Sequence, residues 1–300
     1  MSADSSNAIG IIGLGIMGHT MAQALIAAGY QVFGFDTDPA KRRRLNRQGG
    51  VALADAAAVA QRCDILITAL PKPQALLDTV TQLAPNPGRR KKRVLIETST
   101  LTLEDKLLAK GILEAKKISM VDAPISGTAH PDPATQWIVF VSGERKTCRD
   151  LEPILKHFSV QAPWVGPFGE GIKMKLVANH WVAILNVASA ETTAFCQAMG
   201  LNPQTMLKHI GHSPYIGTGL MRIRVPMMIQ EKFTPATMKI GVWQKDMSII
   251  GQMMRSHALH APLFQASASI YNQAESKGLG EYDTAAVAQI LAPARRTHRS

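Results

Sequence analysis

The chain has 300 residues and a formal net charge of +11; 46% of its residues are hydrophobic and 18% are charged. This composition is typical of one large globular domain or two modest ones, and it excludes a disordered chain. Three widely spaced cysteines form neither a disulfide framework nor a metal-ligand pattern, so we expect no metal site and a reducing, cytoplasmic compartment.

No targeting or membrane segment is expected. The first residues, MSADSSNAIGIIG, lack the basic region, apolar core and cleavage site of a secretory signal. The longest apolar run, 176–190, contains Asn179, His180 and Asn186 and is too short and too polar to cross a bilayer. We therefore expect no membrane partner.

Positive charge is concentrated in three blocks, at 41–44, 89–93 and 295–299. An excess of positive charge can favour binding of nucleic acid, of an anionic cofactor or of acidic substrates, or it can contribute to solubility alone. Only 5% of the residues are aromatic and none interrupts the blocks, which argues against stacking on single-stranded nucleic acid. We expect these blocks to be solvated loops and helix ends, with no nucleic-acid partner.

The first half of the chain alternates short apolar runs with helical patterns. Such alternation indicates βαβ units and a parallel sheet that is covered on both faces. Strands are predicted at 8–15, 30–36, 63–70, 93–97 and 118–122, with helices at 16–28, 39–47, 73–83 and 102–111; strands at 136–143 and 159–165 flank a helix at 147–157.

The second half is predicted to be all-helical. Helical patterns cover 171–199, 203–210, 236–256 and 261–276, prolines separate them, and no convincing strand pattern follows residue 171. We therefore predict an α/β domain over residues 1–166 and an all-α domain over residues 167–300. The first helix of the second domain is unusually long and is expected to join the two.

A glycine-rich loop follows the first predicted strand and opens the first predicted helix. Its G-x-G-x-x-G pattern is formed by Gly13, Leu14, Gly15, Ile16, Met17 and Gly18. In this context the glycines permit a tight turn and close approach of a pyrophosphate, which the helix N-terminus attracts. A tight turn without a ligand is the alternative, and we consider it weaker because of the residue described next.

Asp36 ends the second predicted strand. An acidic residue at this place can accept hydrogen bonds from the adenosine ribose hydroxyls and repels a 2′-phosphate, which favours NAD. Arginines at 42–44 follow closely and could instead accommodate the phosphate of NADP. The predicted cofactor is NAD or NADP, with a preference for NAD.

A third motif, Asp122-Ala123-Pro124-Ile125-Ser126-Gly127, lies just after the fifth predicted strand. Ligands of open parallel sheets bind outside the carboxyl ends of the strands, and a Ser-Gly pair there can offer a hydroxyl and backbone N–H groups to an anion. On its own the motif could equally be an ordinary turn.

The combination of motifs is more specific than any one of them. The glycine loop is followed by Leu70-Pro71, Ser99-Thr100, DAPISG, Gly169-x-Gly171 with Lys175 and Asn179, and Lys245-Asp246. In this order the chain resembles the β-hydroxyacid dehydrogenase family, which includes 3-hydroxyisobutyrate dehydrogenase and tartronate semialdehyde reductase. The resemblance covers residues 8 to 290.

The resemblance implies a Rossmann domain, a helical domain, and NAD(P)-dependent oxidation of an alcohol β to a carboxylate. It implies a small hydroxy acid substrate and a homodimer or homotetramer. Carried over to this chain, it assigns catalysis to Lys175 and Asn179, substrate binding to Ser126 and Gly127 with the adjoining Thr128, and cofactor contacts to Leu70, Pro71, Thr100 and Lys245.

Lys175 suits its implied role. Hydride transfer requires a group that takes the hydroxyl proton during oxidation and returns it during reduction, and a lysine in a low-dielectric cleft can do both. Asn179 shares its helix face, one turn on. Helical geometry alone does not choose between Lys173 and Lys175; the resemblance selects Lys175, and Lys173 is expected to reach solvent or pair with an acid.

Two departures from the family pattern put the substrate in doubt. The glycine-rich stretch after Ser126 is replaced by residues including Thr128, His130 and two prolines, and the first residue of the family's Asn-Asn pair is Ala178. Trp137 is expected to be a packing residue and His130 an exposed loop residue.

Two other functions remain open on the sequence. The altered loop could serve reduction of an imine or a bulkier ketone on the same fold, although imine reductases replace the family's lysine. The chain could also be a non-catalytic protein that binds NAD or nucleic acid through its basic blocks. Retention of Lys175, Asn179 and Lys245 argues against the second of these.

Overall fold

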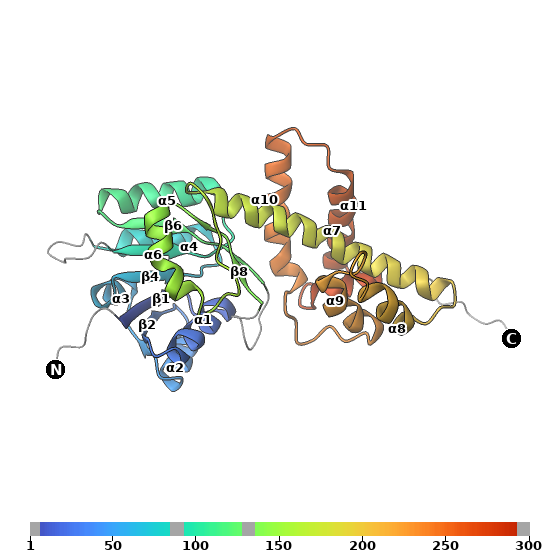
Figure 1. The fold of residues 1–300 in the computed structure, drawn as a ribbon, viewed down its shortest axis with the longest axis horizontal. Helices are drawn as coiled ribbons and strands as arrows, with labels where there is room; N and C mark the ends of the chain where they lie inside the picture. The colour runs from blue at the N-terminus through green and yellow to red at the C-terminus, as the bar shows by residue number, and fades with distance from the viewer. Residues whose placement is uncertain (1–6, 85–92, 128–135, 293–300) are drawn as a thin grey trace. The chain divides into compact units, whose positions relative to one another are not determined.

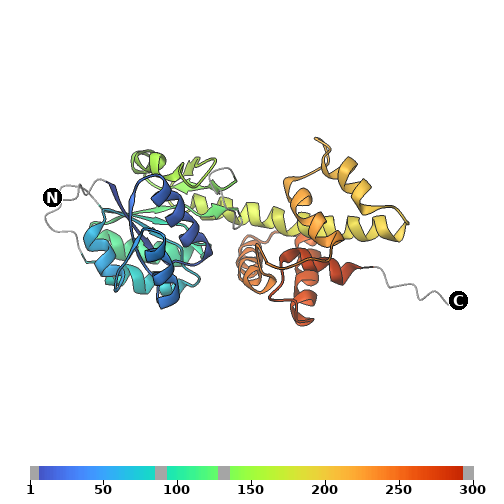
Figure 2. The same ribbon diagram turned by 90° about the horizontal axis from the view of Figure 1, so that it is seen from below.

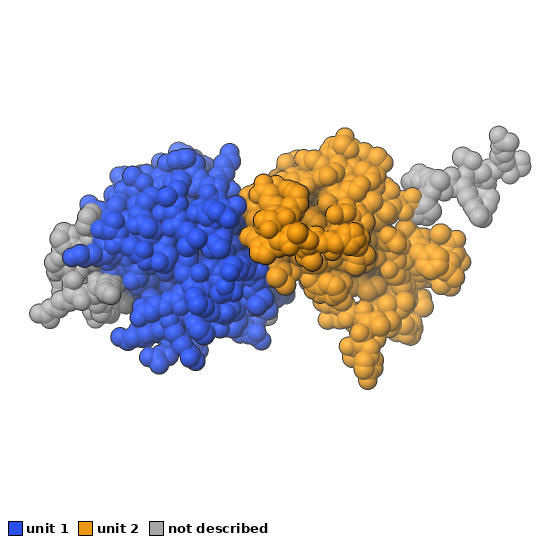
Figure 3. Space-filling model, turned by 90° about the horizontal axis from the view of Figure 1, so that it is seen from above, with its two compact units in different colours: residues 1–175 blue, residues 176–300 orange. Residues whose placement is uncertain are grey.

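The computed structural model describes residues 7–84, 93–127 and 136–292. It separates into two compact units, Met1–Lys175 (unit 1) and Leu176–Ser300 (unit 2), drawn in blue and orange in Figure 3. The predicted fold class is confirmed, because unit 1 contains an α/β sheet domain and unit 2 is helical. The domain boundary between residues 166 and 167 stays a prediction.

Unit 1 is built on one eight-stranded sheet with the order β10-β9-β6-β5-β4-β1-β2-β3. Strands β1 to β6 run parallel, whereas β9 pairs antiparallel with β6 and parallel with β10. The strands are β1 (Ala8–Ile12), β2 (Gln31–Phe35), β3 (Val51–Ala52), β4 (Ile65–Thr68), β5 (Val94–Glu97), β6 (Ser119–Asp122), β9 (Val141–Ser142) and β10 (Trp164–Gly166).

Helices cover both faces of this sheet (Figures 1 and 2). Alternate strand residues enter two separate apolar clusters, so that Ile67 packs on one face and Leu66 on the other. One face is covered by α1 (Ile16–Ala27), α2 (Pro39–Arg47) and α6 (Arg145–Leu155), and the other by α3 (Ala56–Arg62), α4 (Pro73–Gln82) and α5 (Leu103–Ala115).

Local sequence signals fix where several of these helices begin. The Asp38 side chain accepts from the Ala40 N–H at the start of α2, and Pro39 occupies the first helical position. The Thr102 hydroxyl likewise caps α5 by accepting from the Asp105 N–H. Both helices begin just after the carboxyl end of a parallel strand, at the edge of the sheet where ligands of such sheets bind.

The strand predicted at 136–143 is split in two. Residues Ile138–Val139 (β8) pair antiparallel with Ile125–Ser126 (β7) in a separate two-stranded sheet, and β9 joins the main sheet. The change occurs at Phe140, whose N–H donates to Pro124 O. Of the strand predicted at 159–165, only the end is found, in β10.

Arg93 corrects our expectation for the second basic block. Its side chain is buried, and its guanidinium donates to the backbone carbonyls of Ala60, Cys63 and Ala84. It therefore ties the C-terminal end of α3 to the segment after α4, because buried carbonyl groups need donors. Residues 89–92 and 295–299 lie outside the described part of the chain.

Helix α7 (Glu170–Ala198) begins in unit 1 and continues into unit 2. Helix α9 differs from the sequence-based expectation, because it contains Pro226 and proline normally interrupts a helix. Among the described residues, no helix has the length and apolar character needed to cross a bilayer. The other elements of unit 2 are α8 (Pro203–Met206), a π-helical turn (Leu207–Gly211), α9 (Gly219–Ile229), α10 (Ile240–Ser256), α11 (Pro262–Ser276), a 3₁₀ turn (Thr284–Val287) and α12 (Ala288–Leu291).

Candidate active site

The glycine loop lies where the strand order reverses. From β1 the chain moves to β2 and β3 on one side, and then returns to β4 on the other side of β1. Ligands of open α/β sheets bind at such a switch point, outside the carboxyl ends of the strands. The loop joins β1 to α1 at that edge. No side chain caps α1 at Gly15, and its first turn contains no acidic residue, so its N-terminal N–H groups can face an anion.

Each glycine of the loop has a separate geometric reason. Gly13 has φ +91°, and a Cβ there would lie 2.3 Å from Ala69 O. A Cβ on Gly18 would lie 1.9 Å from Gly13 O, so this glycine lets helix and strand approach. A Cβ on Gly15 would meet nothing within 4 Å. Folding therefore explains Gly13 and Gly18, while the open space over Gly15 fits a dinucleotide pyrophosphate.

Asp36 is placed directly beside this loop. Its carboxylate is buried and accepts from Leu14 N–H at 2.8 Å and from Asp38 N–H at 2.9 Å. Lys41 Nζ lies 3.4 Å from the carboxylate. Arg42 donates to Asp36 O at 2.6 Å and stacks over the Phe35 ring. The site thus offers an acidic group with a cation close to it.

The next two parallel strands bring Leu70, Pro71 and Thr100 to the same edge. Leu70 follows β4, and its N–H donates to Ser99 Oγ at 2.8 Å after β5. The Ser99 N–H in turn donates to Glu97 Oε1 at 2.9 Å. The two loops therefore hold each other through Ser99, a residue that our site prediction did not include.

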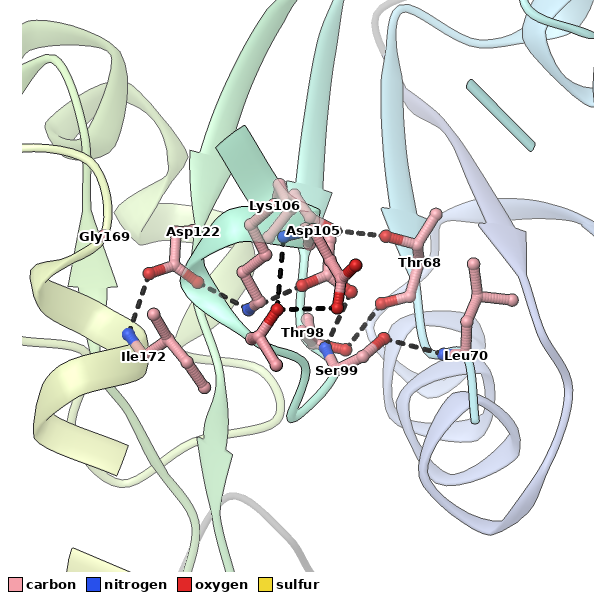
Figure 4. Close-up of polar contacts among 12 residues, drawn as sticks. Thr68, Leu70, Thr98, Ser99, Asp105, Lys106, Asp122, Gly169 and Ile172 are labelled. Carbon is pink, nitrogen blue, oxygen red and sulfur yellow. Dashed lines mark hydrogen bonds and ion pairs between the residues drawn. The ribbon is translucent and has the colours of Figure 1, made fainter. Parts of the chain in front are cut away.

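A buried cation lies next to this pair of loops (Figure 4). Lys106, on α5, is fully buried; its Nζ lies 2.6 Å from Glu97 Oε2 as an ion pair and donates to Asp122 Oδ1 at 2.6 Å. Burial opposes the charge, but the two carboxylates outweigh it and raise the pKa of Lys106 above its usual value. Lys106 is accordingly an ammonium at neutral pH.

The second oxygen of Asp122 holds the start of α7. Asp122 Oδ2 accepts from Ile172 N–H at 2.8 Å and lies 3.1 Å from Ser142 Oγ. A carboxylate at this place is favourable because the first N–H groups of a helix lack partners. A Cβ on Gly171 would lie 2.9 Å from Asp122 Oδ2, so this glycine permits the approach.

The two lysines of α7 have different environments. Lys175 is 7% exposed, whereas Lys173 lies on the surface and donates to Glu170 at 2.9 Å. Pairing of Lys173 with an acid is as expected. Lys175 follows Ile172 by about one turn, so the Asp122 contact anchors the backbone that carries it.

Asn179 and Lys245 are linked within unit 2 through Asp246. Asn179 is buried and its Nδ2 donates to Asp246 Oδ2 at 2.8 Å. The other carboxylate oxygen lies 3.6 Å from Lys245 Nζ. Asp246 thus orients the Asn179 amide, leaving its carbonyl oxygen for a different donor.

Ser126 ends β7, and Gly127 follows it over a buried indole. Trp137 is fully buried, which confirms it as a packing residue, and a Cβ on Gly127 would lie 2.3 Å from Trp137 Cδ1. Gly127 is therefore required by close packing. Thr128 and His130 lie outside the described residues.

One sequence signal could have revealed the buried cation. Lys106 stands at helical spacing from Ala109 and Leu113, which are both buried, so it occupies the apolar face of α5. Its partners Glu97 and Asp122 come from two different strands, and no local pattern connects them.

Comparisons with known proteins agree with this geometry. Residues 8–166 match the family model described as the NAD binding domain of 6-phosphogluconate dehydrogenase. Residues 169–291 match the one described as NAD-binding of NADP-dependent 3-hydroxyisobutyrate dehydrogenase. Together the two models span nearly the whole described chain.

Relatives and solved structures extend the likeness. Glyoxylate/succinic semialdehyde reductase 2, chloroplastic, from Arabidopsis thaliana is 26% identical over 96% of this chain and 80% of its own. 3-Sulfolactaldehyde reductase from Escherichia coli K12 is 28% identical over 93% of this chain and 94% of its own. The crystal structure of 3-hydroxyisobutyrate dehydrogenase from Salmonella typhimurium superposes with a TM-score of 0.82 at 23% identity, covering 94% of this chain and 99% of that one. The chain belongs to the 3-hydroxyisobutyrate dehydrogenase family of NAD(P)-dependent hydroxyacid oxidoreductases.

Proposed function

We propose that this enzyme interconverts a small 3-hydroxy acid and its semialdehyde or 3-keto acid, with Lys175 as the general acid/base. The observation that carries the proposal is the burial of Lys175 on a helix whose first turn is fixed by Asp122, in the same unit as the dinucleotide loop. Bound nicotinamide would accept or deliver the hydride. The glycine loop and the Leu70 and Thr100 loops would hold it.

The proton chemistry is assigned to Lys175 and Asn179. During reduction the Lys175 ammonium would donate a proton to the oxygen on which negative charge develops, and during oxidation its amine would take the hydroxyl proton. Asn179, held through its amide nitrogen by Asp246, would use its carbonyl oxygen to orient the lysine or the substrate hydroxyl.

The Ser126-Gly127 pair is assigned to the acidic group of the substrate. The named relatives act on glyoxylate, succinic semialdehyde or 3-sulfolactaldehyde, which are all small carbonyl compounds with an anionic group. A serine hydroxyl and the backbone N–H groups beside a glycine suit such an anion. We propose that the substrate of this chain belongs to this class of compounds, and we assign no single member of the class.

A matched pair of variants tests the role of Lys175. Lys175→Ala should lose roughly a thousandfold in kcat, because removing a general acid/base typically costs about 10²–10⁴-fold, while the Kd for cofactor changes less than about threefold. Lys173→Ala, on the same helix but exposed and paired with Glu170, should retain wild-type kcat. A Lys175→Ala enzyme with most of its activity would refute the assignment.

A substrate panel tests the reaction class. Oxidation of 3-hydroxyisobutyrate and threonate, and reduction of succinic semialdehyde, glyoxylate and 3-sulfolactaldehyde, are followed by absorbance of the reduced cofactor. We expect turnover with one or more of these acids. Turnover confined to cyclic imines or uncharged ketones would instead favour the imine-reductase alternative.

NAD is the proposed preferred cofactor. Asp36 presents a buried carboxylate beside the loop, and the neighbouring Arg42 guanidinium is already engaged by backbone carbonyls. Lys41, at 3.4 Å, and the arginines at 43–44 oppose this preference. A kcat/KM for NADPH above that for NADH would overturn it.

We further propose a cytoplasmic homodimer or homotetramer formed through unit 2. Phe195 on α7 is 65% exposed, and Met199 and Leu201, just past the end of that helix, are each 59% exposed. Exposed apolar groups of this size favour a protein partner. Phe195→Asp should reduce the mass measured by light scattering, whereas Leu108→Asp on α5 should leave it unchanged. All three cysteines are buried thiols, which suits a reducing compartment.

A further inference from the structure

We propose that Lys106 is a positioning residue for hydride transfer: its buried ammonium locks the cofactor-side loop to the first turn of the helix that carries Lys175. The role in turnover rests on the function proposed above, whereas the locking of the two segments does not. Lys106 belongs to none of the motifs that led to the family. It touches neither cofactor nor substrate in this inference and acts only through Glu97 and Asp122.

The charges of the cluster require a cation at this place. Glu97 and Asp122 are both fully buried at the ends of neighbouring parallel strands, in register with each other. Two carboxylates side by side in a low-dielectric interior repel strongly. Lys106 enters from α5 and contacts both at 2.6 Å, which leaves a net charge of −1 on the cluster.

The Glu97 side of the cluster reaches the cofactor loops. Glu97 Oε1 accepts from Ser99 N–H, and Ser99 Oγ accepts from Leu70 N–H. Glu97 thus uses one oxygen for the loops and the other for Lys106. The positions of the backbone after β4 and β5 therefore depend on how Glu97 is oriented.

The Asp122 side reaches the helix that carries the general acid/base. Asp122 Oδ1 accepts from Lys106 Nζ, and Oδ2 accepts from Ile172 N–H and contacts Ser142 Oγ. The same Ser142 hydroxyl accepts from Gly169 N–H at 3.2 Å. The remaining negative charge therefore faces the N-terminus of α7, where the helix dipole favours it.

Each carboxylate of the pair binds two partners at once. Each carboxylate has one oxygen on a functional segment and one on Lys106, so the ammonium sets the angle of both. A displacement of about 1 Å in a reacting group can cost roughly a hundredfold in rate. Lys106 therefore holds two segments that must stay in register for the reaction.

The test compares three variants. Lys106→Met removes the cation and leaves two buried carboxylates, which threatens folding. Lys106→Met/Glu97→Gln removes the bridge but keeps the cluster at a net charge of −1, and the amide introduced by Glu97→Gln retains an oxygen for Ser99 N–H. Glu114→Gln is the matched control: it lies on the same helix, α5, and removes only an exposed ion pair with Lys110.

Hydrogen exchange by mass spectrometry on the cofactor-free protein gives a readout that is independent of activity. In Lys106→Met/Glu97→Gln, the peptide around Ile172 should exchange at least tenfold faster, while peptides of β1 and β2 should be unchanged. Glu114→Gln should match wild type throughout. Wild-type exchange around Ile172 in the double variant would overturn the proposal.

Kinetics give the second readout. For the double variant we expect kcat to fall roughly 10- to 100-fold, with the Kd for cofactor within about threefold because the Ser99 contact is kept. A normal kcat together with fast exchange would refute the role in turnover. If the wild-type enzyme turns over no hydroxy acid, the proposed function fails, and the exchange data still decide whether Lys106 locks α7.

Discussion

Replacing Gly15 by alanine should separate cofactor binding from folding. Gly15 has φ −65° and ψ −166°, which an L-residue adopts without strain, and its added Cβ would meet nothing within 4 Å. Loss of chain entropy in the unfolded state favours alanine by about 0.4–1 kcal/mol. The poorer capping of α1 by alanine costs a similar amount. The free energy of unfolding should therefore change by less than about 1 kcal/mol.

Cofactor affinity should respond very differently. The Cβ would stand where a pyrophosphate approaches the backbone, so one or two hydrogen bonds from N–H groups to a charged oxygen would be lost. At about 1.5–3 kcal/mol for each such bond, a loss of about 2–3 kcal/mol corresponds to a roughly 30- to 150-fold increase in Kd.

Two measurements check this prediction. Calorimetric titration gives the Kd for NAD and NADP, and thermal unfolding of the cofactor-free protein gives Tm, which should shift by less than about 4 °C. Gly18→Ala is the contrasting variant, because its Cβ would lie 1.9 Å from Gly13 O and the fold itself should lose stability. A Gly15→Ala protein with unchanged Kd, or with a Tm as low as that of Gly18→Ala, would refute the reasoning.

Three further predictions concern single side chains. Asp36→Asn removes the charge that opposes a 2′-phosphate while keeping an oxygen for Leu14 N–H, so the ratio of the Kd for NADP to that for NAD should fall roughly tenfold, about 1.4 kcal/mol. Asp283 is buried; burial raises its pKa, but Arg224 and several hydrogen bonds outweigh this and lower it. The charged Asp283 thus stabilises the fold above about pH 4, and this stabilisation is lost as the pH falls below that value. Asp283→Asn should lower the free energy of unfolding by about 3–5 kcal/mol at pH 7, as measured by denaturant titration. The free energy of unfolding of this variant should also change less with pH in the acid range than that of the wild type. Burial raises the pKa of Cys148 to about 11, so the native thiol should resist iodoacetamide at about pH 7.5 and react in denaturant; rapid native labelling would contradict its burial.

The ligand edge of unit 1 could be predicted from sequence because its signals are local. The glycine loop has its strand before it and its helix after it, and Asp36 closes the next strand. By contrast, the split of the 136–143 run at Phe140 depends on a hydrogen bond to Pro124, which a run of apolar residues does not encode. Helix α9 depends on packing that tolerates Pro226 near its end.

The supporting charges could not be predicted in the same way. Glu97, Lys106 and Asp122 are separated in sequence, and LEDKLLAK is also typical of an exposed helix face. Only the parallel pairing of β5 with β6 brings the two carboxylates together, and only the packing of α5 places the lysine above them. Long-range pairing, rather than a motif, creates this cluster.

The fluorescence of Trp137 can report on the substrate loop. Its indole is shielded from water and packs under Gly127, in the loop that we assign to the acidic group of the substrate. Trp164 and Trp181 are 42% and 57% exposed, so acrylamide can quench their emission and leave the shielded signal. What remains comes from Trp137 and the buried Trp243, and a Trp243→Phe variant isolates the former. Loop occupancy can then be followed by emission in real time, without turnover and before any substrate has been named.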